Sequence, residues 1–546
     1  MGRQRVWQAI LLVIYLAAGV EAARAQAAPP APNPGLILNE NERNRQQMEQ
    51  RNNEEMQAPA IVIPPTAPAM LGEPGGPTVL LRSVTFDASV FLSKEELDAI
   101  AARYVGKDVD AYQIQLLVKA VNDFYAQKGV VTALAFLPEQ DLQTGQLRVG
   151  LVEGRLGMVT IRDNKNLPAD AVAAAIPAQP GAVIDVPKLG ADVARFNRTH
   201  NAQLQASLQP GESFGLTDIA LSVIEPPINV LQLFIDNQGV TSVGELEGGV
   251  NFQRYGLLGR DDKLTLYGAF SEGDRTFTGA YNLPFNRSGG RLGISASLGT
   301  IRIVQGPYES LHVRGHSDSF GLNGSQPIFI DQNWQILFNA SVARGFSASS
   351  QDGTVVTHDI TDKSTFGLTL GYLTQSFSTS ISPNFSFADT RFKVTDLKEN
   401  FYTFNGTAFA TWHPMGDYVV TFAGAWQVAN ETLIPGDQLF QAGGPTTVRG
   451  YPTGAVAGYT GYYGNLELHH PLNTVLDGLD VFGFYDRGEI FSTFPKDLQL
   501  NSLGLGSSWD SHKNIIAELS AGFPVTHTVD HQLGYEIYFR LTSRFE

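Results

Sequence analysis

The chain has 546 residues, no cysteine and a formal net charge of −16, and it contains 55 glycines. The acidic balance excludes a nucleic-acid-binding protein, because neutralising phosphates requires clustered lysine and arginine. The lack of cysteine excludes a disulfide framework and a thiolate metal site.

The N-terminus has the features of an export signal. Two arginines precede the mostly apolar stretch 6–20, and Ala-Arg-Ala at 23–25 gives the small-x-small pattern of a signal-peptidase site. We therefore predict a cleaved signal peptide at 1–25. The alternative is a membrane anchor, but the apolar run is short for a bilayer span, and no later segment offers the ~18 consecutive apolar residues that a membrane helix needs.

The next segment combines a polar centre with proline-rich ends. Its centre, NENERNRQQMEQRNNEEMQ, consists of good helix formers with almost no apolar face, so it is a solvated helix or disordered unless tertiary contacts hold it. We predict a helix within residues 26–57. The proline-rich residues 58–78 are predicted to form an extended linker.

Two small α/β domains are predicted to follow, each with the element order β-α-α-β-β. In residues 79–154, a strand precedes a helix that starts with a capping box at Ser93 to Glu96. A second helix has apolar residues at helical spacing, namely Ile114, Leu117, Val118, Val121 and Phe124. Residues 155–226 repeat the order in about the same length, which indicates a tandem module.

Residues 227–546 lose the helical period and consist of short alternating segments separated by turn residues. In the last segment, Ile537, Phe539 and Leu541 alternate with polar side chains, so one face suits lipid and the other suits water. At ~20 residues per strand and turn, this region holds roughly 16 transmembrane strands. The fold class is therefore mainly β, with a 16-stranded antiparallel barrel. An array of soluble β-sandwiches is the alternative, but a closed barrel removes exposed edges.

Two enzyme-like patterns have structural explanations. The G-x-S-x-G sequence at 211–215 needs a strand-to-helix turn to act as a nucleophile elbow, but here it lies between two predicted strands. His527 and His531 have ligand-like spacing, but they lie in a short hairpin loop. We therefore predict no enzymatic activity, no cofactor and no metal.

Asp486 is the charged residue that most needs a partner. In VFGFYDRGEIF (481–491), period-two alternation places it on one face with Phe482 and Phe484. A charge on the lipid face costs up to ~2–4 kcal/mol near the midplane, so Asp486 is predicted to face the lumen. A buried carboxylate there requires a cation.

These motifs resemble those of a known family. VRGY (448–451) followed by F-x-D-x-G (484–488) resembles the signature pair of outer-membrane assembly and translocation barrels. Residues 125–157 resemble the first POTRA (polypeptide-transport-associated) domain of two-partner secretion transporters, the haemolysin and filamentous-haemagglutinin exporter family. Residues 257–266 and 281–290 are similar to that family's opening barrel strands.

The resemblance implies an internal lock. In the family, the loop between strands 11 and 12 folds into the lumen, and its arginine pairs with the aspartate of strand 13. Carried over, Arg449 pairs with Asp486. The matching residues of the loop and strand motifs are Val448, Arg449, Gly450, Tyr451, Phe484, Asp486 and Gly488. The polar helix within 26–57 is similar to the family's plug helix.

The resemblance also implies a function, a location and partners. The chain is expected in the bacterial outer membrane, with two POTRA domains in the periplasm that bind an unfolded, dedicated exoprotein for secretion. Outer-membrane lipid and the barrel assembly machinery are the other expected partners. Family barrels usually end on an aromatic residue, whereas Phe545 is followed by Glu546 here. An insertase for other outer-membrane proteins, or a passive porin-like channel, remains an alternative.

Overall fold

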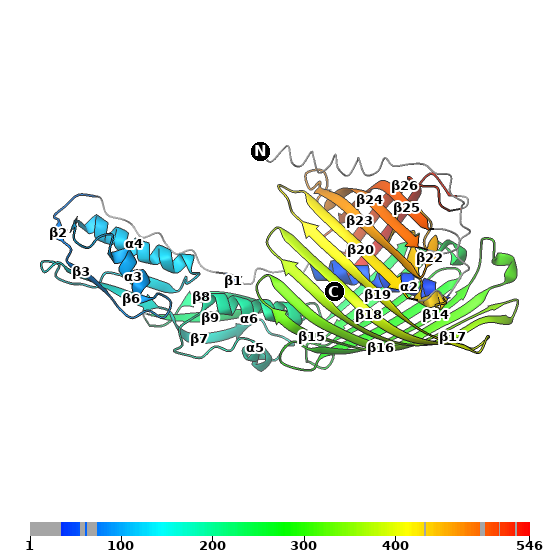
Figure 1. The fold of residues 1–546 in the computed structure, drawn as a ribbon, viewed down its shortest axis with the longest axis horizontal. Coiled ribbons are helices and arrows are strands. Elements are labelled where there is room, and N and C mark those ends of the chain that lie inside the picture. Colours follow the sequence, from blue (N-terminus) through cyan, green and yellow to red (C-terminus); the bar gives the residue numbers. More distant parts are fainter. Residues whose placement is uncertain are drawn as a thin grey trace.

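The computed structural model describes residues 34–54, 61–62, 74–213, 215–430, 433–491, 497–512, 514–529 and 532–546. The predicted signal peptide lies outside these residues, as does most of the predicted linker. Figure 1 shows two small α/β units in a row at one end of the molecule and a β-barrel at the other. None of the described helices is both long and apolar enough to cross a membrane.

The first α/β unit forms around the predicted helices. Its elements are β2 (Val79–Leu80), β3 (Ser83–Phe86), α3 (Lys94–Ala101), β4 (Asp108–Val109), α4 (Ala111–Gln127), β5 (Ala133–Phe136) and β6 (Gln146–Glu153). The capping box at the start of α3 is present, because Ser93 and Glu96 exchange side-chain-to-backbone hydrogen bonds. Helix α4 buries Leu117 and Val121 against a sheet of order β3-β6-β5.

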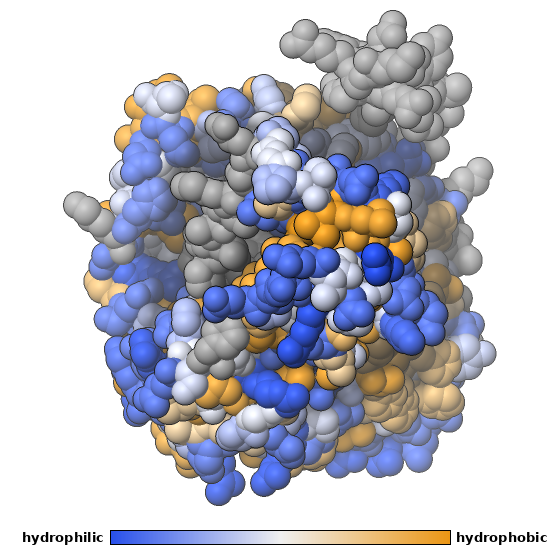
Figure 2. Space-filling view, turned by 90° about the vertical axis from the view of Figure 1, so that its left-hand side faces the viewer, coloured by the Kyte–Doolittle hydropathy of each residue, from blue (hydrophilic) through white to orange (hydrophobic). Residues whose placement is uncertain are grey.

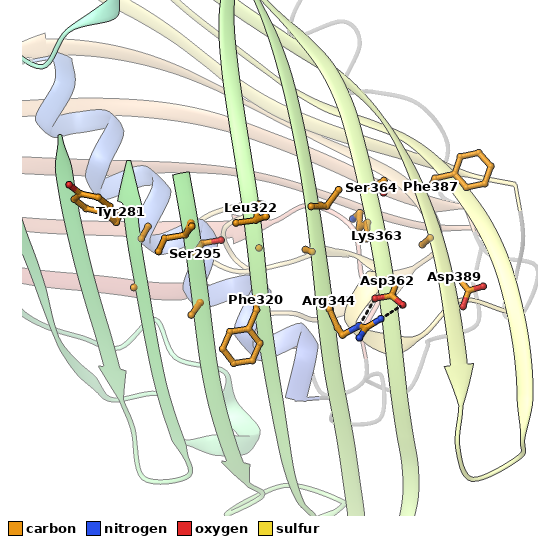
Figure 3. Close-up of a pocket in the computed structure, with 18 of the residues that line it drawn as sticks. Tyr281, Ser295, Phe320, Leu322, Arg344, Asp362, Lys363, Ser364, Phe387 and Asp389 are labelled. Carbon is orange, nitrogen blue, oxygen red and sulfur yellow. Dashed lines mark hydrogen bonds and ion pairs between the residues drawn. The ribbon is translucent and has the colours of Figure 1, made fainter. Parts of the chain in front are cut away.

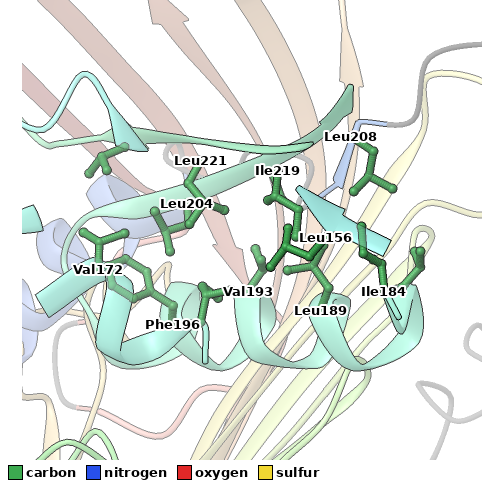
Figure 4. Packing of buried hydrophobic residues seen from close by; sticks show 14 of the residues in the cluster. Leu156, Val172, Ile184, Leu189, Val193, Phe196, Leu204, Leu208, Ile219 and Leu221 are labelled. Atoms are coloured by element: carbon green, nitrogen blue, oxygen red, sulfur yellow. The ribbon is translucent and has the colours of Figure 1, made fainter. Parts of the chain in front are cut away.

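The second unit repeats this plan. It contains β7 (Arg155–Arg162), α5 (Ala169–Ala175), α6 (Val186–Thr199), β8 (Gln203–Pro210) and β9 (Leu216–Ile224). Helix α6 packs Leu189, Val193 and Phe196 against the sheet, where they meet Leu204 and Leu221 (Figure 4). The residues of the G-x-S-x-G sequence that the structure describes connect the antiparallel strands β8 and β9.

One sheet contains a strand that was not predicted. The two-residue strand β1 (Ile61–Val62) pairs in parallel with β8, which gives the order β1-β8-β9-β7. Residues 61–62 therefore cover one edge of the second unit. The sequence does not indicate where a segment of the linker docks.

The rest of the chain forms a closed antiparallel barrel of sixteen strands, as predicted. Alternation holds in the final strand, where Ile537 and Leu541 are 49% and 47% exposed whereas Tyr538 and Thr542 are each 5% exposed. The barrel strands are β10 (Asn229–Asp236), β11 (Glu247–Tyr255), β12 (Lys263–Phe270), β13 (Asp274–Pro284), β14 (Arg291–Arg302), β15 (Arg314–Ile330), β16 (Trp334–Gln351), β17 (Thr354–Leu373), β18 (Phe377–Phe392), β19 (Leu397–Trp412), β20 (Val419–Ala429), β23 (Thr460–Pro471), β24 (Leu479–Phe491), β25 (Leu498–Asp510), β26 (Ile515–Pro524) and β27 (Glu536–Phe545).

Helix α2 (Pro34–Glu54) lies inside the ring of strands (Figure 1). The helix begins with a short apolar segment that precedes its polar centre and was not part of the prediction. Leu36 and Ile37 are buried, and Ile37 packs against a cluster that includes Ile301 and Val313 of the barrel end. This contact buries apolar surface, in addition to the polar side chains of Glu40, Asn41 and Asn44, which are also buried.

Candidate functional site

The candidate site is a loop that folds into the barrel. We call residues 433–459, which lead from β20 to β23, the lumen loop. It contains a two-stranded hairpin of β21 (Phe440–Ala442) and β22 (Val456–Gly458). Between these strands, Val448 and Tyr451 are completely buried and Arg449 is 6% exposed. The loop motif is therefore packed in the interior of the barrel.

Arg449 and Asp486 form a two-pronged ion pair. Arg449 Nε donates to Asp486 Oδ2 at 2.7 Å, and Nη2 donates to Oδ1 at 2.7 Å. The backbone N–H of Arg449 also donates to Oδ2 at 3.0 Å. Asp486 is 0% exposed. Such parallel charge-assisted hydrogen bonds fix both position and orientation.

The topology gives the pair the connectivity that the resemblance implied. In barrel order, β20 and β23 are strands 11 and 12, and β24, which carries Asp486, is strand 13. Asp486 lies on the same inward face as Phe484 and Gly488, as alternation requires.

Three further motif residues, Gly450, Gly488 and Tyr451, have a physical reason for their type. Gly450 has a φ of +87°, which favours glycine, and a Cβ there would lie 3.0 Å from the backbone of Gly522. A Cβ on Gly488 would lie 2.9 Å from the side chain of Val448, so this glycine makes room for the loop. The Tyr451 hydroxyl lies within hydrogen-bond distance of two backbone oxygens, at 3.0 Å for Asn501 and 2.8 Å for Thr526, and can donate to one of them at a time.

The structure adds partners of Arg449 that sequence reasoning missed. Arg449 Nη1 donates to Glu467 Oε1 at 2.5 Å, and the guanidinium lies 3.5 Å from the ring centroid of Phe484. Glu467 stands opposite Phe484 in the β23–β24 register and so shares its inward face. The sequence could have revealed Glu467, because period-two alternation applied to β23 places it on the inward face.

His469 extends this network along β23 and β24 from Glu467 to Asp480. His469 Nε2 lies 2.9 Å from Glu467 Oε2, and Nδ1 lies 2.6 Å from Asp480 Oδ2. Both ring nitrogens therefore face carboxylate oxygens, which suits the imidazolium form because only that form has two N–H donors. The network alternates in charge from Asp480 through His469, Glu467 and Arg449 to Asp486.

Helix α2 is bonded directly to the lumen loop. Thr446 donates to Glu40 Oε1 at 2.7 Å, and Arg43 donates to Gln441 Oε1 at 3.1 Å. Arg43 also pairs with Glu40 within the helix. The helix and the loop therefore form one hydrogen-bonded unit inside the barrel.

The same helix is attached to the barrel wall on another side. Asn41 Nδ2 donates to Asp274 Oδ2 at 2.9 Å and to Thr276 Oγ1 at 3.1 Å, and both acceptors lie on β13. All three side chains are buried. These contacts explain how a helix with a polar surface is held in the lumen.

Nothing in the described residues forms a metal centre, since no group of three histidine, aspartate or glutamate side chains has suitable geometry. Ser213 of the G-x-S-x-G sequence lies in the turn that leads into β9, where its backbone oxygen accepts from Leu216 N–H at 3.0 Å. The site is an arrangement of ion pairs and hydrogen bonds that joins helix α2, the lumen loop and the barrel wall.

Comparisons with known families cover most of the chain. Residues 79–154 match the family model described as "POTRA domain, ShlB-type". Residues 215–509, more than half of the chain, match the model described as "Haemolysin secretion/activation protein ShlB/FhaC/HecB".

Individual proteins are similar at lower identity. The outer membrane transporter CdiB of Dickeya dadantii is 22% identical over 479 residues, which cover 83% of this chain and 84% of that protein. The heme/hemopexin transporter protein HuxB of Haemophilus influenzae (strain 86-028NP) is 21% identical over 481 residues, with the same two shares. The solved structure of CdiB from Escherichia coli has a TM-score of 0.69 at 19% identity, covering 95% of this chain and all of that one. The CdiB structure from Acinetobacter baumannii gives 0.63 at 16% identity, covering 94% and 100%. These structures share the fold.

Proposed function

The chain belongs to the haemolysin secretion/activation protein family ShlB/FhaC/HecB, and on that premise we propose that helix α2 and the lumen loop together keep its pore closed at rest. The protein is an outer-membrane transporter of two-partner secretion, and its POTRA domains lie in the periplasm. The observation that supports closure is the hydrogen-bonded unit of helix and loop inside the barrel.

The ion pair would serve as the lock of the loop. Arg449 is held by Asp486 and Glu467 from two neighbouring strands, and its guanidinium covers the ring of Phe484. The planar fork of arginine suits two carboxylates better than the single ammonium group of lysine. The lock would hold Val448 and Tyr451 against the wall and thereby fix the position of the loop.

The POTRA domains would bind the exoprotein in an extended form. Strand β5 forms one edge of the first sheet, pairing only with β6 among the described strands, and Leu134 on it is 47% exposed. An extended segment can add to such an edge through main-chain hydrogen bonds, here by displacing the Asn122 side chain, which bonds both main-chain groups of Ala135 on β5. In the second unit, β1 covers the β8 edge, and the start of the β7 edge is also covered, because Leu156 exchanges backbone hydrogen bonds with Ala182 and Gly181. Figure 2 shows that this end of the molecule is largely hydrophilic with an apolar patch.

Transport would use no nucleotide. The chain contains no glycine-rich sequence suited to cradle a phosphate, so folding of the exoprotein outside the cell would supply the driving force. The barrel assembly machinery would insert the barrel. At the end of β27, the Glu546 carboxylate pairs with Arg544 at 2.8 Å.

Secretion of the dedicated exoprotein tests this function. Cells that express the transporter with the large exoprotein encoded beside it should release that exoprotein into the medium, and an Arg449→Ala transporter should release much less. The insertase alternative predicts a different result, in which loss of the transporter depletes many unrelated outer-membrane proteins. A porin-like channel predicts ion conductance without release of the exoprotein.

A further inference from the structure

The last barrel strand, β27, presents two buried polar side chains to the interior, and they have different partners. Tyr538 and Arg540 are 5% and 6% exposed. Arg540 Nε donates to Asp236 Oδ2 of β10 at 2.9 Å, which joins the last strand to the first. Tyr538 points instead to the tip of the lumen loop, at Gly450 and Tyr451. The tip is therefore in contact with a strand that carries none of the predicted motif residues.

The Tyr538 hydroxyl makes two hydrogen bonds with the main chain of this tip. It donates to the carbonyl oxygen of Tyr451 at 2.8 Å and accepts from the N–H of Gly450 at 3.0 Å. Within the described residues, these two main-chain groups have no other hydrogen-bond partner. A buried N–H or C=O group without a partner is unfavourable. One hydroxyl therefore satisfies two buried groups that otherwise lack partners.

Two glycines bring the tip within reach of this hydroxyl. A Cβ on Gly522 of β26 would collide with the backbone nitrogen of Gly450. Because neither residue has a side chain, the main chain of the tip lies directly against the barrel wall, on the strand that pairs with β27. The tip is therefore held by its backbone as well as by the side chain of Arg449.

These two points of attachment lie on different strands. Asp486 is on β24 and Tyr538 is on β27, and strands β25 and β26 lie between them in the barrel. The side chain of Arg449 bonds Asp486 and Glu467 and does not bond Tyr538. Loss of the ion pair therefore leaves the bonds of Tyr538 to the tip in place.

The lumen loop also borders a hollow in the barrel. This hollow of about 900 Å³ extends along strands β12 to β19. Ser295 and Ala343 line it with small side chains, and Lys363 beside them donates to Gln438 of the lumen loop at 3.0 Å (Figure 3). The tip can move into this space when its attachments to the wall of β24 to β27 are released.

We propose that Tyr538 is a second anchor of the lumen loop, which holds the main chain of the tip while Asp486 holds the Arg449 side chain. Both anchors must release before the tip can leave the wall. Tyr538 is a positioning residue, since it acts on the pore only through the loop. Exposure of the loop follows from these contacts alone, whereas any effect on conductance also rests on the proposed closure by helix α2 and the lumen loop.

Chemical labelling of the loop in the full chain tests this anchor. The chain has no cysteine, so Ala455→Cys places a single thiol in the loop at a position that is 5% exposed. Whole cells are treated with a membrane-impermeant maleimide. Tyr538→Phe, which removes only the hydroxyl, should raise the labelling rate about tenfold. Arg449→Ala should also raise it, and the double variant should show the product of the two single increases, because the anchors are separate.

The matched control is Tyr462→Phe, because the Tyr462 hydroxyl lies 3.2 Å from Glu489 Oε2 on β24 and does not bond the loop tip. It should label as slowly as the wild-type loop, and heat-modifiable migration confirms that each barrel is folded. A wild-type labelling rate in folded Tyr538→Phe, an equal increase in the control, or a double variant no faster than Arg449→Ala would overturn the second anchor. Conductance in planar bilayers is recorded on the same variants. Faster labelling without higher conductance would support the anchor and contradict the proposed closure.

Discussion

The lock predicts strong energetic coupling between Arg449 and Asp486. Arg449→Ala removes two side-chain hydrogen bonds from a carboxylate that is 0% exposed, but the backbone N–H of residue 449 still reaches Asp486 Oδ2. Breaking a buried ion pair by removing one partner costs about 3–5 kcal/mol. Because one donor survives, we expect the lower end of this range, about 3 kcal/mol, for Arg449→Ala.

A double-mutant cycle measures the coupling. The free energy of unfolding is obtained by urea titration of the barrel in lipid vesicles for the wild type, Arg449→Ala, Asp486→Ala and the double variant. The double variant should be little less stable than either single one, with a coupling of about 2–3 kcal/mol. The adjacent Arg487→Ala is the control, because Arg487 faces outward and bonds Tyr462 at 3.2 Å; it should change stability by less than ~0.5 kcal/mol.

Glu467, the second carboxylate that binds Arg449, allows a further test of the ion-pair network. Exchanging the charges, with Arg449→Asp and Asp486→Arg, would restore a simple pair. In this structure, however, the new aspartate would lie beside Glu467, which has lost its arginine donor. We therefore expect no rescue of stability or secretion by the exchange. Additive single effects in the cycle, or full rescue by the exchange, would refute the network described for Arg449.

Three further predictions concern the helix and the POTRA domains. Deleting residues 34–54 should raise the ion conductance of the barrel in planar bilayers without preventing assembly, and unchanged conductance would count against the plug. Deleting residues 79–154 should abolish exoprotein release while the barrel still shows heat-modifiable migration; normal release would exclude the first POTRA domain as a binding site. Burial alone would raise the pKa of Glu225, but backbone N–H donors, led by Leu167, outweigh it and hold this pKa below the usual range. Glu225 therefore stabilises its turn above the unfolded-state pKa and loses this effect as pH falls through the lower folded-state pKa, so Glu225→Gln should speed amide exchange of Leu167 at pH 7 and make little difference at pH 2.

Local patterns predicted the elements of this fold well. The capping box depends only on Ser93 and the three residues that follow it, and alternation in the final strand shows which of its faces is apolar. Both features can therefore be predicted from a short stretch of sequence. The need of Asp486 for a cation was also anticipated, because a buried carboxylate requires one, whereas Arg449 as that cation was implied by the family resemblance. The seven motif residues lie together around the lumen loop and β24.

The contacts that were missed join segments far apart in the chain. Glu40 and Thr446 are separated by 406 positions, and no period or spacing in the sequence indicates that they meet. The docking of β1 on β8 has the same origin, since a two-residue strand has no pattern of its own. The network of Glu467, His469 and Asp480 could have been predicted in part from the sequence, because alternation on β23 places Glu467 on the inward face.

Tethering the helix to the barrel wall tests the central claim most directly. The chain has no cysteine, so Asn41→Cys and Thr276→Cys, whose native side chains lie 3.1 Å apart, would introduce a unique pair. If helix α2 must leave the lumen for the exoprotein to pass, oxidation of this pair should stop exoprotein release, and a reductant should restore it, while either single cysteine variant secretes normally under both conditions. Undiminished release from transporters shown to be fully cross-linked would contradict the account.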